Sequence, residues 1–225
     1  MNIILFGPPG AGKGTQADNM VKNFNLHKIS TGDLLREEIK NNTDLGNKIK
    51  SKIDQGLLVS DDIINDLIIK ILPKKKYYNS IIFDGYPRNL VQAKSLDLLL
   101  IKYNQKLSCV INLNVDKESI IKRILGRLVC SKCGLTFNKY FDPPQKEKYN
   151  CNLKYLKART DDNEKTIEKR FDTYTKKTLP ILDYYADQKI LYKIDGTRQI
   201  NQIIDEIRSI FDSLETWLCK LHLYK

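Results

Sequence analysis

The amino-acid sequence predicts an α/β fold of three layers, with a five-stranded parallel sheet flanked by helices. Short apolar runs alternate with segments of helical periodicity along most of the chain, which is typical of strand–helix–strand units. The first apolar run leads into a glycine-rich loop and a helical segment, an order typical of phosphate-binding folds. The 225 residues fit one large domain carrying insertions, because single hydrophobic cores stop growing near roughly 250 residues.

Apolar runs bounded by polar residues are interpreted as strands that are buried on both faces. These runs cover residues 2–6, 28–30, 80–84, 108–115 and 189–194. Helical periodicity predicts helices over residues 13–24, 31–41, 43–54, 61–72, 88–103, 116–126, 161–187 and 200–214. The last of these carries Ile200, Ile203 and Ile207 at the spacing of one helix face.

Two stretches interrupt the alternation of strands and helices. Residues 30–59 place two helical segments after the second strand, and we expect them to form a small helical insertion. Residues 127–160 lose the helical period, and we expect a compact, loop-rich lid of functional length. The remaining segments, 1–29, 60–126 and 161–214, are expected to form the core. The tail, 215–225, either lengthens the last helix or offers a contact to a partner or membrane.

Lys and Arg outnumber Asp and Glu by 38 to 27, and the net charge of +11 favours anionic partners. These include nucleic acids, acidic membrane surfaces and phosphorylated small molecules. Much of the excess is Lys beside abundant Asn and Ile, which a compositional bias of the source explains equally well. Because the chain has no apolar run of roughly 18 residues and opens without signal-peptide features, we expect a cytoplasmic protein without a membrane partner.

The clearest motif opens the chain, where residues 7–15 read Gly-Pro-Pro-Gly-Ala-Gly-Lys-Gly-Thr. The spacing fits the phosphate-binding loop (P-loop) G-x-x-x-x-G-K between a strand and a helix. Glycines allow backbone N–H groups to turn toward an anion, the following helix presents its positive end, and Lys13 adds a charge. One departure is that the hydroxyl comes a residue late, at Thr15. We expect phosphates to contact Gly10, Ala11, Gly12, Lys13, Gly14 and Thr15.

A second motif begins where the apolar run 80–84 ends. Asp84 lies at the sheet edge where ligands bind in α/β folds, so its carboxylate could orient Mg²⁺ beside nucleotide phosphates. The alternative is a plain helix N-cap. Gly85, Tyr86 and Pro87 follow, and we expect Arg88 at the start of a helix, facing the same crevice and suited to bidentate phosphate contact.

Four motifs in order resemble the adenylate kinase family in its long-lid form. They are residues 7–15, Ser-Thr-Gly-Asp-Leu-Leu-Arg at 30–36, Asp-Gly-Tyr-Pro-Arg-Asn at 84–89 and Arg-Thr-Asp-Asp at 159–162. The resemblance covers residues 2 to about 214 and implies reversible phosphoryl transfer from MgATP to AMP, giving two ADP. Because the acceptor phosphate is already ionised at neutral pH, this reaction needs positioning and cations rather than a general base.

The resemblance also assigns residues to each nucleotide. AMP is implied to contact Thr31, Arg36, Leu57, Leu58, Val59, Gly85, Tyr86, Pro87, Arg88, Gln92, Arg159 and Arg170, with Gln92 at its adenine edge. ATP is implied to contact the P-loop and Arg123, Arg127, Thr136, Phe137 and Arg198. The groups implied to act on the transferred phosphoryl are Lys13, Asp84, Arg88, Arg127, Arg159 and Arg170. A cis bond between Tyr86 and Pro87 is implied as well.

Cysteines in the lid raise the question of zinc. Cys130 and Cys133 have the spacing of a metal knuckle, and Cys151 follows where the family's zinc-bearing members place a second pair. The fourth ligand would fall at Lys154, which cannot coordinate zinc while protonated, and structural zinc is almost always four-coordinate. Asp142 is a remote candidate. We favour a lid without zinc, held together by the packing of Phe137, Tyr140 and Phe141.

Other functions remain compatible with the sequence. The acceptor could be another nucleoside monophosphate, or the donor could be GTP, because few side-chain contacts discriminate among them. A nucleotide-gated nucleic-acid-binding protein would explain the net charge, the cysteine knuckle and the lid aromatics Tyr140 and Phe141. We expect a monomeric adenylate kinase that uses ATP, AMP and ADP with Mg²⁺ and has no nucleic-acid partner.

Overall fold

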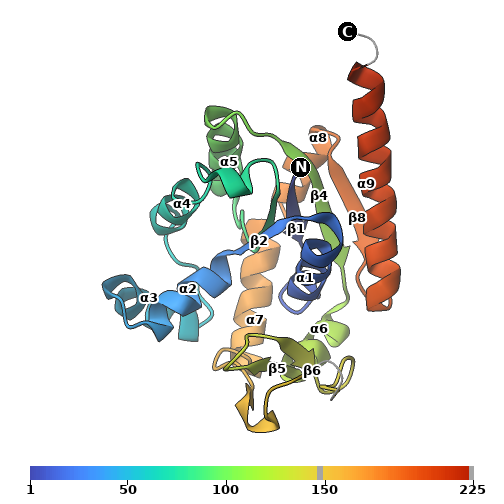
Figure 1. The fold of residues 1–225 in the computed structure, drawn as a ribbon. Helices are drawn as coiled ribbons and strands as arrows, with labels where there is room; N and C mark the ends of the chain where they lie inside the picture. Colours follow the sequence, from blue (N-terminus) through green and yellow to red (C-terminus); the bar gives the residue numbers. More distant parts are fainter. Residues whose placement is uncertain (146–148, 223–225) are drawn as a thin grey trace.

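A computed structural model describes residues 1–145 and 149–222, with side chains described up to residue 214. The predicted five-stranded sheet is present and parallel, in the order β2, β3, β1, β4, β8 (Figure 1). Its strands are β1 Asn2–Phe6, β2 His27–Ser30, β3 Ile81–Asp84, β4 Leu107–Asn114 and β8 Leu191–Asp195. Each overlaps its predicted range, so the apolar runs located the sheet correctly.

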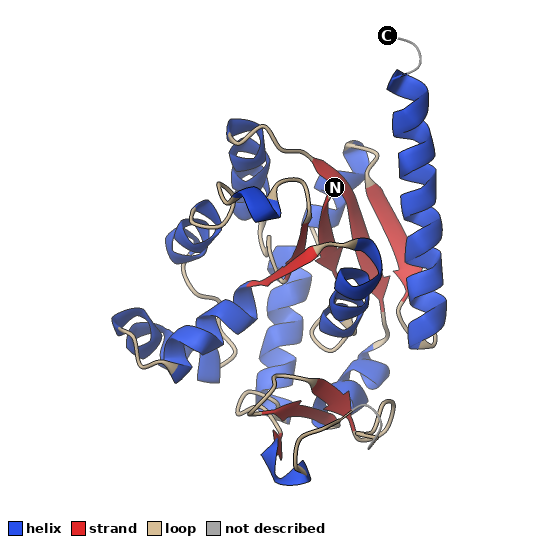
Figure 2. Ribbon diagram, viewed as in Figure 1, coloured by secondary structure: helices blue, strands red, loops and turns tan. Residues whose placement is uncertain are grey.

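Helices cover both faces of this sheet (Figure 2). Strand β1 shows why: Ile3 and Leu5 belong to one apolar cluster and Ile4 and Phe6 to the other, because successive strand side chains point to opposite faces. The first cluster includes residues of α1 Lys13–Phe24, α6 Lys117–Leu125, α7 Glu164–Thr173 and α9 Ile200–His222. The second includes residues of α4 Asp61–Ile69, α5 Leu90–Lys102 and α8 Ile181–Asp187. The predicted α/β fold is therefore confirmed.

The single helix predicted over 161–187 is wrong. The chain forms α7, a wider π-helical turn over Tyr174–Thr178, and then α8. Pro180 lies immediately before α8, and because proline has no N–H group it cannot continue a regular helix from the preceding turn.

The helix predicted from residue 88 begins at Leu90 instead, since the Asn89 side chain caps it by accepting a hydrogen bond from the Gln92 N–H at 2.8 Å.

Two insertions project from the core, as Figure 1 shows. Residues 30–59 carry the helices α2 Thr31–Lys40 and α3 Asp44–Asp54, which pack against each other. The segment 127–160, predicted to be loop-rich, contains a small antiparallel sheet in the order β6, β5, β7. Its strands are β5 Arg127–Cys130, β6 Thr136–Asn138 and β7 Leu156–Lys157. These strands have two to four residues, too short for an alternating pattern to be recognised.

Helix α7 and the turn after it contact the neighbouring segments at two points. A Cβ atom on Gly56, at the end of the helical insertion, would lie 2.6 Å from Thr166 Cγ2 on α7. The backbone of residue 56 therefore approaches α7 as closely as only glycine allows. Farther along, the Thr178 hydroxyl donates to the Arg88 carbonyl at 2.9 Å. Both contacts place α7 between the insertion and the segment after β3.

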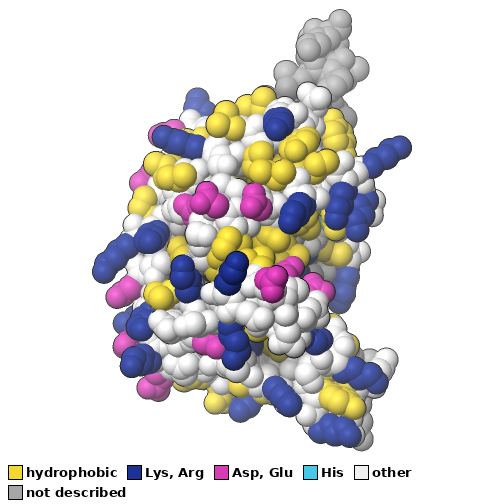
Figure 3. All heavy atoms as spheres, turned by 90° about the vertical axis from the view of Figure 1, so that its left-hand side faces the viewer, with side chains coloured by type: hydrophobic (Ala, Val, Ile, Leu, Met, Phe, Trp, Pro, Cys, Tyr) yellow, Lys and Arg dark blue, Asp and Glu magenta, His cyan; other side chains and the backbone are white. Residues whose placement is uncertain are grey.

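The last helix, α9, continues to His222, so most of the predicted tail extends this helix. No helix within the described residues combines the length and the apolar character needed to cross a membrane. On the face shown in Figure 3, Lys and Arg side chains are scattered among Asp and Glu and do not form one basic patch. On this face, therefore, the excess of Lys and Arg is dispersed.

Two buried tyrosines provide a matched test of the core. Tyr185 is fully buried and its hydroxyl has no hydrogen-bond partner among the described residues, whereas the Tyr86 hydroxyl donates to Asn65 Oδ1 at 3.1 Å. Tyr185→Phe should therefore leave the free energy of unfolding unchanged or raise it, and Tyr86→Phe should lower it by about 1 kcal/mol. Urea denaturation of both variants checks this; equal losses would contradict the difference in hydroxyl partners.

Candidate nucleotide-phosphate site

The loop between β1 and α1 depends on its glycines. Gly7, Gly10 and Gly12 have φ values of 144°, 81° and 94°, in the region that residues with a Cβ rarely adopt. A Cβ on Gly7 would also lie 2.8 Å from the Leu113 carbonyl oxygen. With glycine at the N-cap, no side chain covers the start of α1, and its backbone N–H groups are free to face an anion.

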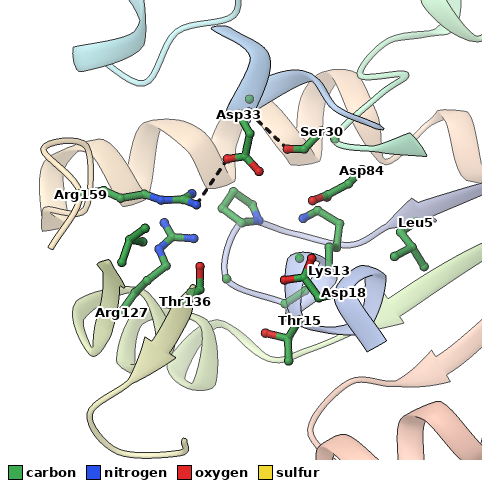
Figure 4. Close-up of a pocket in the computed structure, with 18 of the residues that line it drawn as sticks. Leu5, Lys13, Thr15, Asp18, Ser30, Asp33, Asp84, Arg127, Thr136 and Arg159 are labelled. Carbon is green, nitrogen blue, oxygen red and sulfur yellow. Dashed lines mark hydrogen bonds and ion pairs between the residues drawn. The ribbon is translucent and has the colours of Figure 1, made fainter. Parts of the chain in front are cut away.

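Lys13 and Asp84 meet at the mouth of this loop, as Figure 4 shows. The Lys13 ammonium donates to the carbonyls of Gly7 and Pro8 at 2.8 and 2.9 Å. Burial lowers the pKa of Lys13 to about 8, opposed by the Asp84 charge and assisted by nearby arginines. Burial raises the pKa of Asp84, while the positive charge of Lys13 lowers it. The loop thus holds an incompletely solvated cation that an incoming anion would stabilise.

Arginines from several elements surround the same cavity, which has a volume of about 1020 Å³. They are Arg36 on α2, Arg88 before α5, Arg127 on β5, Arg159 before α7 and Arg170 on α7. Burial, followed by the repulsion of the neighbouring guanidinium groups, lowers the pKa of Arg170 to about 9 and that of Arg159 to about 10. Both remain cationic at neutral pH. Such a concentration of like charge fits a polyanionic ligand.

Carboxylates pair with these arginines, and their role was not predicted from the sequence. Asp162 accepts from Arg127 Nε at 2.7 Å and lies 3.8 Å from Arg170 Nη1. Asp161 pairs with Arg170, and Asp33 pairs with Arg36 and lies 3.6 Å from Arg159 Nη2. The sequence offered one indication, because these aspartates lie in the same motifs as Arg36 and Arg159. The spacing alone did not show which arginine each aspartate would pair with.

A smaller cavity of about 50 Å³ adjoins the large one. The predicted residues that line it are Thr31, Arg36, Leu57, Leu58, Val59, Gly85, Arg88, Gln92 and Arg170. Its walls are tied together: the Thr31 hydroxyl and Arg88 Nε both donate to the Gly85 carbonyl, at 2.9 and 2.7 Å. Tyr86, expected beside them, lines neither cavity and is buried in the core. The Tyr86–Pro87 bond is cis, as implied.

Most other predicted residues line the large cavity. They are Gly10, Ala11, Gly12, Lys13, Gly14, Thr15, Asp84, Pro87, Arg123, Arg127, Thr136, Phe137, Arg159 and Arg198. Arg123 Nη1 donates to the Ala11 carbonyl at 3.3 Å, and its guanidinium lies 5.6 Å from the centre of the Phe141 ring. Arg198 is half exposed and pairs with Glu206 at 3.0 Å. Asp84 does not cap α5, whose N-cap is Asn89.

Cys130, Cys133 and Cys151 come together in the lid, with their sulfur atoms within 4.8 Å of one another. The Tyr149 hydroxyl donates to Cys130 Sγ at 3.2 Å. Lys154 is directed elsewhere, with its ammonium 5.3 Å from the centre of the Tyr155 ring. Within the described residues no histidine or carboxylate joins the cluster, and Asp142 pairs through its backbone with Asn138 instead. The thiols therefore supply three ligands where a closed zinc site requires four.

The apolar core of the lid differs from the one expected. Phe137 is buried as predicted, but Tyr140 and Phe141 are 59% and 50% exposed. The core pairs Phe137 with Tyr149 edge to face at 5.2 Å between ring centres, and includes Leu128, Cys130, Cys151, Tyr155 and Leu156. Tyr140 instead lies against Gly126, where an added Cβ would come within 2.6 Å of its ring.

Comparison with known proteins gives a consistent result. The family model for adenylate kinase matches residues 5–190. The chain is 49% identical over 210 residues to an adenylate kinase of Pelagibacter ubique, covering 93% of this chain and 99% of that protein. It is 44% identical to one of Alkaliphilus oremlandii, covering 92% and 96%, and 42% identical to one of Methanosarcina barkeri, covering 93% and 98%.

The lowered pKa of Lys13 predicts that binding of a polyanion is linked to proton uptake. Above pH 8 the free protein has partly lost this proton, and an anion in the loop restores it, so affinity should fall as the pH rises through about 8. Calorimetry with inorganic tripolyphosphate in buffers of different ionisation enthalpy measures the uptake. Lys13→Arg should remove most of it, because arginine stays charged; an unchanged uptake would contradict the role of Lys13.

Proposed function

Because this chain belongs to the adenylate kinase family, we propose that it transfers the γ-phosphoryl group of ATP reversibly to AMP, giving two ADP. The observation that carries this proposal is the convergence of Lys13 and the cavity arginines on one glycine-lined loop. They come from the core, the helical insertion and the lid, so the site is complete only when all three segments are assembled around the ligands.

The reaction needs no proton acceptor from the protein. A phosphate oxygen of AMP forms a bond to the γ-phosphorus, and the bond from that phosphorus to the bridging oxygen breaks, leaving the electron pair on ADP. Of the two histidines in the sequence, His27 stacks edge to face on Tyr77 at 5.3 Å between ring centres and does not line the large cavity, and His222 lies outside the described side chains. The rate enhancement then depends on in-line positioning and on the stabilisation of negative charge.

The cavity residues divide between the two nucleotides. The P-loop and Lys13 bind the β- and γ-phosphates of ATP, and Arg36 and Arg88, which also line the small cavity, bind the phosphate of AMP. Arg127, Arg159 and Arg170 surround the transferred group and stabilise its charge. Arg127, Arg159 and Arg170 each pair with an aspartate in the free protein, and bound phosphate oxygens would replace these aspartates as their anionic partners.

Magnesium accompanies ATP in this family reaction, and two side chains suit it. The Asp84 carboxylate lies 3.8 Å from the position of a Cβ on Gly14, and Thr15 offers a hydroxyl in the first turn of α1. Both are oxygen donors, which Mg²⁺ prefers, and Asp84 would reach the ion directly or through water. When bound, the ion neutralises charge between the β- and γ-phosphates. Asp84 and Thr15 would thus hold the ion beside the P-loop.

The helical insertion and the lid act as covers for the site. In the structure they touch: Arg159 lies 3.6 Å from Asp33, and the Thr160 hydroxyl donates to Asp54 Oδ1 at 3.4 Å. Closure of both covers over bound nucleotides would exclude water, which otherwise competes with AMP for the phosphoryl group. We infer that the aromatic core keeps the shape of the lid without structural zinc, because Phe137 and Tyr149 pack together beside the three thiols.

Arg88→Ala should lower the kcat/KM for AMP by at least 10²-fold, because a charged donor to the acceptor phosphate is lost from a desolvated site. A coupled assay of ADP formation with AMP, GMP, CMP and UMP measures this and should show strong preference for AMP. Arg208→Ala, an exposed arginine on α9, is the matched control and should behave as the unmodified protein. An unchanged rate in Arg88→Ala would contradict the site assignment.

Metal analysis tests the lid separately. Purified protein should contain far less than one equivalent of zinc, and removal of metal with a chelator should leave the unfolding temperature unchanged, since the described ligand set stops at three thiols. A zinc content near one equivalent that is lost together with stability would overturn this proposal without affecting the kinase assignment.

A further inference from the structure

The side-chain amide of Gln92 is held in one orientation, which limits the hydrogen bonds that the small cavity can offer to a base. Gln92 lines this cavity and is 2% exposed. Its Oε1 accepts from the Arg88 backbone N–H at 2.7 Å, and its Nε2 donates to Asp61 Oδ1 at 2.6 Å. A backbone N–H only donates and a carboxylate only accepts. If the amide flipped, two donors would face each other at one end and two acceptors at the other.

Asp61 is itself held in place. Asn89 Nδ2 donates to both carboxylate oxygens of Asp61, at 3.0 and 3.1 Å. The Oδ1 atom of the same Asn89 accepts from the Gln92 N–H at 2.8 Å, as the cap of α5. Asp61, at the start of α4, and Gln92, in the first turn of α5, are therefore joined both directly and through Asn89. The carboxylate cannot rotate away without breaking these hydrogen bonds.

What remains free on Gln92 is one acceptor position on Oε1 and one N–H on Nε2, in a fixed order. The Watson–Crick edge of adenine presents an amino donor beside the N1 acceptor, and this order matches it when the base lies with its amino group toward Oε1 and N1 toward Nε2. A 6-oxopurine presents the reverse, a carbonyl acceptor beside an N1–H donor. An amide that can rotate could form hydrogen bonds with either edge, whereas an amide held in one orientation can form them with only one.

We propose that Asp61 is a specificity-determining positioning residue, which fixes the Gln92 amide so that the acceptor site takes a 6-aminopurine nucleotide and rejects a 6-oxopurine nucleotide. The proposal rests on the proposed function, in which Gln92 faces the base of AMP. It assigns Asp61 no contact with the substrate: the residue acts through Gln92.

The test compares AMP with inosine monophosphate, which changes the 6-amino edge without adding the 2-amino group of guanine. The quantity measured is the ratio of kcat/KM for AMP to kcat/KM for inosine monophosphate. Asp61→Asn keeps the size of the side chain but offers the Gln92 amide both a donor and an acceptor. This substitution should lower the ratio about tenfold, within the range by which a bidentate contact discriminates between base edges.

Two comparisons separate positioning from a general loss of structure. Asp62→Asn, an exposed aspartate in the same turn of α4, should leave the ratio unchanged. In a Gln92→Leu background, Asp61→Asn should have no further effect on the ratio, because the amide through which it acts is absent. If Asp61→Asn lowers kcat/KM for both nucleotides equally, or shifts the ratio equally in the Gln92→Leu background, the proposal is wrong.

A second variant keeps the test decisive if Asp61→Asn does not fold. Asn89→Ser retains an N-cap hydroxyl for α5 and removes only the amide that holds Asp61, so it should also lower the ratio, by a smaller factor. An unchanged ratio in a folded Asn89→Ser protein would count against the network. If the unmodified protein phosphorylated neither nucleotide, the proposed function itself would fail, an outcome distinct from unaltered selectivity in the variants.

Discussion

Lys13 and the arginines around it repel one another, and their removal from water adds to the free-energy cost of bringing them together. The structure meets this cost with carboxylates: Asp162 at Arg127, Asp161 at Arg170, and Asp33 between Arg36 and Arg159. These pairs keep the guanidinium groups extended into the cavity without a ligand. In the proposed function, bound phosphates would take the place of these carboxylates as partners of the guanidinium groups, which already line the cavity.

The fold brings these groups together from distant parts of the sequence. Asp84 follows β3 and the P-loop follows β1, and because neighbouring parallel strands end at the same edge, the two meet at the start of α1. The insertions then deliver Arg36 from one direction and Arg127 and Arg159 from the other. The sheet and its covering helices thus hold the P-loop and Asp84, while Arg36, Arg127 and Arg159 are carried by the two smaller segments.

Sequence patterns were sufficient where one local property decides the structure. Apolar runs located the five strands, and glycine spacing located the P-loop, because each depends on residues that are close in the chain. Sequence patterns were less successful for features that depend on contacts between distant residues. The lid strands are fixed by their pairing with one another. The break before α8 is a different kind of failure, because Pro180 is a local signal in the sequence that the helical period over 161–187 obscured. The role of Asp61 could not be seen at all, because its partners lie 28 and 31 residues away.

Helix α7 and the turn after it contact several of the segments that form the site. At one end its Thr166 lies against the tightly fitted Gly56 of the helical insertion, in the middle Arg170 lines the large cavity, and at the end of the π-helical turn the Thr178 hydroxyl donates to the Arg88 carbonyl. The lid is attached directly before this helix. Helix α7 and the turn after it thus contact both the helical insertion and the segment that carries Arg88. If the two covers close over nucleotides as proposed, movement of one would be passed to the other through these contacts, and filling of one nucleotide site would favour filling of the second.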